Sequence, residues 1–245
     1  MDFDAIAEQL VKGKEAAGVK VTIPEGLTVW QTANLLAEKG LVDIDAFIEY
    51  TLQGDFPYDY LPPKGTEDRL EGFLFPNTYQ IAEGWGEKEI VDMLLAQFDK
   101  TFTAEWRKQA ETMDMTISEI VTMASIIERE GKIAEERPII ASVFYNRLGK
   151  DMLLQSCATV QYLLGEPKPR LTNQDISIDS PYNTYKNVGL PPGPIAAPGA
   201  ESLEAALYPA ETDYMYFCSK EDGTGSQAFA VTLAEHNANV AKYLD

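Results

Sequence analysis

The chain has 245 residues, of which 45% are hydrophobic and 24% charged, ordinary values for a globular protein. Its 20 basic and 39 acidic residues give a formal charge of −19. This charge argues against nucleic acid as a partner, because phosphate binding calls for clustered Lys and Arg. Two cysteines and a single histidine form no zinc-ligand spacing, so we expect neither a metal nor another cofactor. No run approaches the roughly 18 consecutive apolar residues that span a membrane, and the N-terminus is acidic, unlike a signal peptide.

The first 54 residues divide into a polar leader and a small unit of regular structure. We interpret residues 1–18 as a leader or linker, since they hold little apolar surface to bury. Residues 19–26 predict a short strand that runs into a Pro/Gly turn. Two helices are expected next, over 29–39 and 44–53, each preceded by a capping Thr or Asp and followed by Gly. Strand, helix and helix together predict a small subdomain over residues 19–54.

The next segment joins this subdomain to the larger part of the chain. Residues 56–65 are rich in Pro and Tyr and are expected to form a connection. Residues 69–81 are dense in aromatic and apolar side chains, which predicts a strand or hairpin. Glu71 stands out as an acid inside that apolar run. Residues 87–111 predict one long amphipathic helix.

A second helix is expected from Thr116, the first residue of a capping box, to Gly131, a suitable C-terminal stop. At about 100° per residue, Glu128 shares the apolar face of this helix, whereas Glu130 projects from roughly the opposite side. Periodicity leaves two interpretations open for Glu128. The one that periodicity itself favours slightly is a structural carboxylate paired with an arginine or a backbone N–H. The other is a general acid whose pKa is raised by apolar surroundings and by the helix dipole.

The remaining chain alternates regular elements with one long irregular segment. A helix is expected over 136–150, followed by a brief extended piece and a short helix that starts at Cys157. Residues 166–199 are rich in Pro, Gly, Asn and Tyr, which is typical of a functional loop or an ordered Ω-loop. A helix near 200–207, strands over 214–219 and 226–231 and a helix from Leu233 complete the expected order.

Six segments in chain order resemble the YceG-like family of endolytic murein transglycosylases. They are IPEGLTVWQTANLLAEKGLV (23–42), LEGFLFPNTYQI (70–81), MASIIEREG (123–131), RPIIASVFYNRLGKDMLLQS (137–156), SPYNTYKNVGLPPGPIAAPG (180–199) and FAVTLAEHNANV (229–240). The resemblance implies an α+β fold, with a LysM-like subdomain over residues 19–54 and a catalytic domain over 55–245. It also implies a single catalytic acid on the A-S-I-I-E segment, which falls on Glu128.

Two features depart from the family pattern. Family members are typically anchored in the cell membrane by one N-terminal helix, with the enzyme outside the cytoplasm. This sequence contains no such helix, so we expect it to be an ectodomain. Many members also read L-Q-T-D-P-T-V, where this chain has Cys157 in place of the Asp. We assign Cys157 no catalytic role and expect a free, buried thiol, since Cys is among the most buried residue types.

The resemblance implies a reaction on peptidoglycan that needs one protein carboxyl. Glu128 would protonate the glycosidic oxygen between N-acetylmuramic acid and N-acetylglucosamine, then accept the proton of the muramic C6 hydroxyl as that oxygen closes on C1. Such an enzyme would terminate or trim nascent glycan strands beside peptidoglycan synthases. Two alternatives stay open: a hydrolytic muramidase with Glu71 or Asp175 as base, and a non-catalytic wall-binding scaffold.

The remaining candidate residues are expected to line the glycan groove. Glu71 could orient a sugar or raise the pKa of Glu128 as a like charge. Tyrosine rings that flank amide side chains in the irregular segment suit sugar binding, and Ser125 lies on the flank of the helix beside Glu128. The full set of expected substrate-binding residues is Glu71, Ser125, Asn146, Arg147, Gln155, Tyr182, Asn183 and Tyr185.

Overall fold

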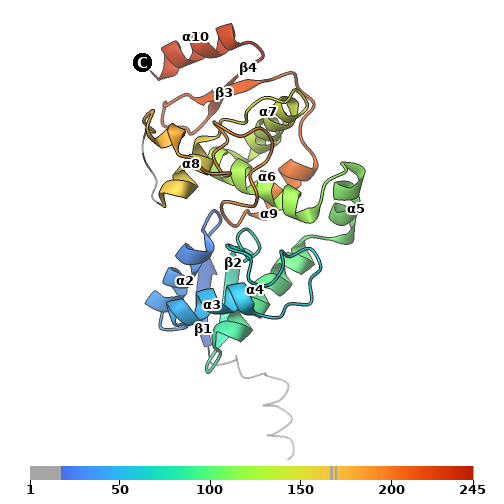
Figure 1. The fold of residues 1–245 in the computed structure, drawn as a ribbon, viewed down its shortest axis with the longest axis vertical. Coiled ribbons are helices and arrows are strands. Elements are labelled where there is room, and N and C mark those ends of the chain that lie inside the picture. Colours follow the sequence, from blue (N-terminus) through green and yellow to red (C-terminus); the bar gives the residue numbers. More distant parts are fainter. Residues whose placement is uncertain (1–17, 166–167, 169, 245) are drawn as a thin grey trace, which may run out of the picture.

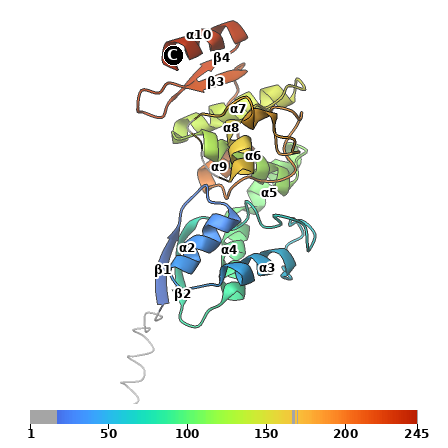
Figure 2. The ribbon, with the colours of Figure 1, turned by 60° about the vertical axis from the view of Figure 1, so that its left-hand side comes forward.

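The computed structural model of the chain describes residues 18–165, 168 and 170–244. The expected leader over 1–18 therefore lies almost entirely outside the described residues. The chain is mostly helical with two small two-stranded sheets, which agrees with the α+β class. Figures 1 and 2 show two lobes stacked along the long axis. Within the described residues, no helix combines the length and hydropathy needed to cross a membrane.

In the part of the chain that the structure describes, the N-terminal lobe, residues 18–101, holds one two-stranded sheet and three helices, which lie together in Figure 1. In chain order these are β1 (Gly18–Ile23), α2 (Val29–Glu38), α3 (Ile44–Gln53), β2 (Asn77–Ala82) and α4 (Glu87–Thr101). The caps expected for the two short helices are confirmed. Thr28 forms a capping box with Gln31, and the Asp43 side chain accepts from the backbone N–H of Ala46.

The two strands of this sheet come from either side of position 54, where the expected subdomain ends. β1 pairs antiparallel with β2, from Gly18 opposite Ala82 to Ile23 opposite Asn77. Helix α3 also packs against α4. Residues 19–54 thus share their sheet and a helix contact with residues beyond position 54. The domain division at that position stays a prediction.

The strand or hairpin predicted over 69–81 is only partly correct. The strand is confined to β2, and the preceding residues form tight turns, with Glu71 N–H donating to the Asp68 carbonyl at 2.8 Å. Gly72 has a φ of +84°, and a Cβ there would come within 2.5 Å of Pro194. The apolar run therefore bends sharply to pack against another part of the chain, and Glu71 lies at that bend.

The single long helix predicted over 87–111 is wrong. The chain forms α4 and then a separate helix, α5 (Ala104–Thr112). Phe102 is fully buried and ends α4, and Thr103 caps α5 by accepting from the Trp106 N–H at 3.3 Å. An N-cap inside an amphipathic pattern redirects the chain although neither Gly nor Pro is present.

The C-terminal lobe surrounds α6 (Ile117–Glu130), the helix that carries Glu128. Every residue from Ile120 to Ile127 is buried, and the capping box of Thr116 with Glu119 is present as expected. Figures 1 and 2 show α6 among its neighbours α7 (Arg137–Leu148), α8 (Cys157–Leu164) and α9 (Ala200–Leu207), all predicted from the sequence. The end of this lobe away from the N-terminal lobe is covered by a hairpin and the last helix. The hairpin consists of β3 (Tyr216–Ser219) and β4 (Gln227–Ala230), and the helix is α10 (Leu233–Tyr243).

Backbone hydrogen bonds join the turn after β1 to the segment before α9. Gly26 N–H donates to the Ala197 carbonyl, and Ala197 N–H donates to the Leu27 carbonyl, both at 2.8 Å. The buried apolar side chains of both lobes also form one continuous core. This junction brings the start of α2 next to the end of α6.

Candidate active site

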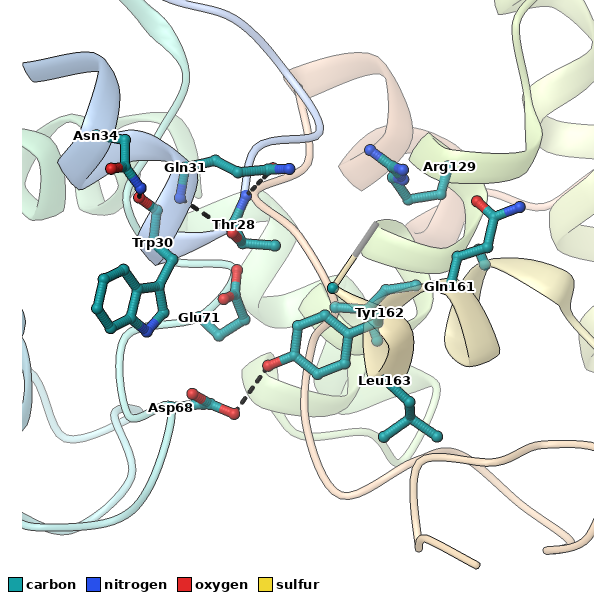
Figure 3. Close-up of a pocket in the computed structure, with 13 residues that line it drawn as sticks. Thr28, Trp30, Gln31, Asn34, Asp68, Glu71, Arg129, Gln161, Tyr162 and Leu163 are labelled. Carbon is teal, nitrogen blue, oxygen red and sulfur yellow. Dashed lines mark hydrogen bonds between the residues drawn. The ribbon is translucent and has the colours of Figure 1, made fainter. Parts of the chain in front are cut away.

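A cavity of about 540 Å³ lies at the junction of the two lobes (Figure 3). Its walls come from the start of α2, the turns around Glu71, the end of α6, helix α8 and Ile195. Its volume falls within the roughly 300–1,000 Å³ typical of ligand sites. Five segments of the sequence therefore converge on a space large enough for a small ligand or a sugar unit.

Glu71 forms part of the inner wall of this cavity. The residue is only 3% exposed, and its Oε2 accepts from the Val29 N–H at 3.1 Å. Its Oε1 is buried and has no hydrogen-bond partner among the described residues. Burial raises the pKa of Glu71 to about 8, so the carboxyl carries its proton at neutral pH.

Aromatic side chains stand on either side of Glu71 in Figure 3. Trp30, from α2, is 53% exposed. Tyr162, from α8, donates to Asp68 Oδ2 at 2.8 Å, and its ring packs against that of Tyr182 at a centroid distance of 5.2 Å. Sequence reasoning did not select Trp30 or Tyr162. The available signal was that Trp30 lies outside the apolar stripe of its helix.

Glu128 lies in the last turn of α6, against the first turn of α9. Its side chain is 7% exposed. Oε1 accepts from Arg137 Nη2 at 3.2 Å, and Oε2 accepts from the Gly199 N–H at 3.0 Å and from Ser202 Oγ at 2.8 Å. Two of these three donors come from the N-terminus of α9, so the first turn of that helix fixes the orientation of the Glu128 carboxyl. Glu128 itself does not line the cavity, whereas the next residue, Arg129, does.

Arg137 gathers two further acidic residues next to Glu128. Its Nη1 donates to Glu201 Oε2 at 2.9 Å, and its Nη2 lies 4.0 Å from Glu25 Oε2. The Glu25 side chain is 48% exposed. Desolvation and the negative charges of Glu128 and Glu201 raise the pKa of Glu25, against an opposing effect of Arg137. The cluster around Arg137 therefore places the enclosed Glu128 beside the more accessible Glu25.

Ser125 does not hydrogen-bond to Glu128. Its hydroxyl donates to the Thr122 carbonyl at 2.7 Å and accepts from the Ile195 N–H at 3.0 Å. Since Ile195 lines the cavity, Ser125 positions a wall of the cavity from beneath. Its expected part in sugar binding stays a prediction.

The side chains of three other expected groove residues donate hydrogen bonds to backbone carbonyls of the protein. Asn146 donates to the Thr212 and Tyr214 carbonyls at 2.8 and 2.9 Å. The buried Arg147 donates to the Met215 carbonyl at 2.7 Å and to the Leu154 carbonyl at 2.9 Å. The amide of Asn183, also buried, donates to carbonyls within its own loop. These contacts are structural, and glycan binding by these residues stays a prediction.

Gln155 and Tyr185 lie around the N-terminus of α8, near Glu130. Gln155 adopts a left-handed backbone with φ of 53°, and its Oε1 accepts from Arg147 Nη1 at 3.4 Å. Tyr185 Oη lies 3.0 Å from Cys157 Sγ. The expectation of a buried thiol is wrong, since Cys157 is free but exposed. Of the expected site residues, only Glu71 lines the cavity.

Comparison with known proteins gives a consistent assignment. Residues 1–242 match the YceG-like family. The chain belongs to the YceG-like family. It is 38% identical over its full length to the endolytic murein transglycosylase of Bacillus subtilis, of which it covers 70%. It is 34% identical to the enzyme of the same name from Streptococcus pneumoniae, of which it spans about half, at 49%.

A solved structure supports the same family assignment. The crystal structure of a YceG-like protein from Listeria monocytogenes superposes with a TM-score of 0.80 at 37% sequence identity. The similarity covers 97% of this chain and 81% of the Listeria chain. The two-lobed arrangement is therefore shared with a YceG-like protein of known structure.

Proposed function

We propose that this chain is an endolytic peptidoglycan lytic transglycosylase. It cleaves the bond between N-acetylmuramic acid and N-acetylglucosamine and leaves a 1,6-anhydro end on the muramic residue. The observation that carries this proposal is the match over the whole of this chain to relatives named endolytic murein transglycosylases, at 38% and 34% identity, of which it spans 70% and 49%. The cavity between the lobes, with carboxyl groups in and beside it, supports a reaction that depends on proton transfer.

Glu128 is the proposed catalytic acid and base. In the first step its proton passes to the glycosidic oxygen as the C1–O bond breaks. In the second step its carboxylate takes the proton of the C6 hydroxyl while the C6 oxygen bonds to C1. The nucleophile belongs to the substrate, so its proximity to C1 supplies much of the rate. Arg137, Ser202 and the Gly199 N–H orient the carboxyl through hydrogen bonds to both of its oxygens.

The assignment is tested by Glu128→Gln with Glu201→Gln as the matched control. Both changes remove a carboxylate that Arg137 contacts, but Glu201 is mostly exposed and bonds only at the edge of the cluster. We expect Glu128→Gln to lower the release of muropeptides from purified peptidoglycan at least a hundredfold, while circular dichroism shows an intact fold. Glu201→Gln should retain most of the activity. Anhydro-muropeptide release by Glu128→Gln at the unmodified rate would contradict the assignment.

The structure lends less support to the hydrolytic muramidase. That reaction needs an ionised base to activate water. Glu71 is protonated at neutral pH, since its pKa is raised to about 8. Asp175 is paired with Lys168 Nζ at 2.8 Å, accepts from Thr172 and does not line the cavity. Glu71 is not ionised and Asp175 lies outside the cavity, so transglycosylation is favoured over hydrolysis.

The non-catalytic scaffold is separated by the same assay. A scaffold would bind purified peptidoglycan without releasing soluble products. As an enzyme of nascent glycan, the chain would work outside the cytoplasm beside peptidoglycan synthases, terminating or trimming new strands. Membrane attachment through a helix N-terminal to this sequence, as in the family, belongs to the same proposal.

A further inference from the structure

The inner wall of the cavity contains a polar group that the protein itself leaves unsatisfied. Glu71 Oε1 is buried without a partner among the described residues, while Oε2 accepts from Val29 N–H. The proton of the neutral carboxyl therefore belongs on Oε1, because Oε2 already receives a donor. An unpaired buried donor costs free energy that a suitable acceptor would recover. Glu71 is thus poised to donate a hydrogen bond to a ligand in the cavity.

Trp30 offers an apolar surface beside this donor. Trp30 is 53% exposed, whereas Val29, Ala33 and Leu36 are the buried apolar residues of α2. Figure 3 shows Trp30 next to Glu71 at the cavity. Large exposed aromatic side chains with no packing role are typical of binding surfaces. A flat ring beside a hydrogen-bond donor suits the apolar face of a pyranose that carries a carbonyl substituent.

The charges around Glu71 decide which ligand group fits. Asp68, Arg129 and Tyr162 line the same cavity, and Tyr182 packs behind Tyr162 at a centroid distance of 5.2 Å. The cavity residues of α2 (Thr28, Trp30, Gln31 and Asn34) are uncharged. Burial raises the pKa values of both phenols, which keeps them neutral. Arg129 Nη1 already donates to the Gly26 carbonyl at 3.1 Å, whereas the negative charge of Asp68 acts on Glu71, so a neutral acceptor is preferred to an anion at this carboxyl.

We propose that the inner end of this cavity is a subsite for an N-acetylated amino sugar, in which Glu71 donates to the acetamido carbonyl and Trp30 stacks on the ring. This inference rests on the proposed function for the source of the ligand, a glycan of acetylated sugars. The proposed function concerns bond cleavage by Glu128, whereas this inference concerns sugar binding by Glu71 and Trp30. Glu71 is here a specificity-determining residue.

Ionisation of Glu71 removes the donor, so binding should depend on pH. With the pKa of Glu71 raised to about 8, the donor is present below pH 7 and lost above pH 9. Glutamine keeps an N–H donor at the same position but does not titrate. Leucine removes the donor together with the unsatisfied oxygen but leaves the Val29 N–H without its acceptor, so circular dichroism must first show that the Leu variant is folded.

The test uses the unmodified chain and two neutral β-1,4-linked tetrasaccharides. Tetra-N-acetylchitotetraose carries acetamido groups but lacks the muramic residue at which cleavage is proposed, and cellotetraose carries hydroxyls instead. Calorimetry at pH 6.5 and pH 9.5 measures the affinity of each. We expect the acetylated sugar to bind about tenfold more tightly at pH 6.5, with most of this preference lost at pH 9.5.

Variants separate the parts of the subsite. Glu71→Leu should abolish the preference for the acetylated sugar, and Glu71→Gln should retain it at both pH values. Trp30→Ala should weaken the binding of both sugars. Equal binding of the two sugars by the unmodified chain, or an undiminished preference in Glu71→Leu, would overturn the subsite. An acetyl preference that behaves as expected in a chain that releases nothing from peptidoglycan would support the subsite and contradict the proposed function.

Discussion

Glu71 illustrates how the surroundings of one residue decide its chemistry. The sequence marks it as an acid in an apolar run, and the structure buries it at a bend of the chain. Its raised pKa means that the folded chain holds a proton that the unfolded chain releases above pH 4.5. Since the native state then binds more protons, stability attributable to Glu71 falls as pH rises from about 4.5 to about 8.

This linkage makes a prediction for Glu71→Gln. The free energy of unfolding of the unmodified chain should fall relative to that of the variant by about 1.4 kcal/mol per pH unit between pH 5 and pH 7.5. Urea denaturation of both proteins across this range measures the difference. Other titrating groups, such as Glu25 and Glu130, are common to both chains and cancel in the comparison. Parallel stability curves would show that Glu71 is already ionised.

At the residue scale, the sequence singles out two carboxyl groups by different signals. Glu71 interrupts an apolar run, which is a local signal, whereas the helical face of Glu128 slightly favours a structural role and only the family resemblance implies a catalytic one. Arg147 and Asn183 looked equally suitable for sugars, but the carbonyls they bind come from segments that only the fold brings close. Trp30 was overlooked because helical periodicity highlights the buried stripe and says nothing about what an exposed aromatic ring faces.

At the scale of elements, the contact between α6 and α8 gives Glu130 a structural role. The partly buried Glu130 extends from the end of α6 to the N-terminus of α8. Its Oε1 accepts from Ser156 Oγ at 2.6 Å and from the Ala158 N–H at 3.3 Å. Burial raises the pKa of Glu130, which the hydrogen bond from Ser156 partly opposes. The helical face argument separated Glu130 correctly from Glu128 but did not reveal this cap of the next helix.

Glu130→Ala is therefore expected to lower the free energy of unfolding by about 1–3 kcal/mol, because it leaves two buried donors without an acceptor. Glu130→Gln keeps an oxygen acceptor and serves as the control, with a much smaller loss. Thermal denaturation of the two variants checks the order. Equal stabilities of the Ala and Gln variants would mean that the cap contributes nothing.

Element boundaries were predictable where capping residues mark them. Thr28, Asp43 and Thr116 each begin a helix as expected. The break between α4 and α5 was missed because the amphipathic pattern continues on both sides of it. The sequence pattern does not reveal the bend at Gly72 for a related reason: Gly72 closely approaches Val121 and Pro194, and local patterns do not encode such contacts.

At the scale of the whole molecule, two lobes meet at the cavity. Helix α2 and the turn at Glu71 contribute one side, and α6 and α8 contribute the other. Glu128 lies next to this junction, where the backbone bonds of Gly26 and Ala197 hold the lobes together. A sugar unit in the cavity would therefore contact residues of both lobes.

The mass of the products released from purified peptidoglycan tests the central claim most directly. Transglycosylation ends each new strand in 1,6-anhydro-N-acetylmuramic acid, which is lighter by one water than the reducing end left by hydrolysis. We predict anhydro products from the unmodified chain and their loss in Glu128→Gln. Reducing-end products, or no release of soluble products by the unmodified chain, would contradict the account.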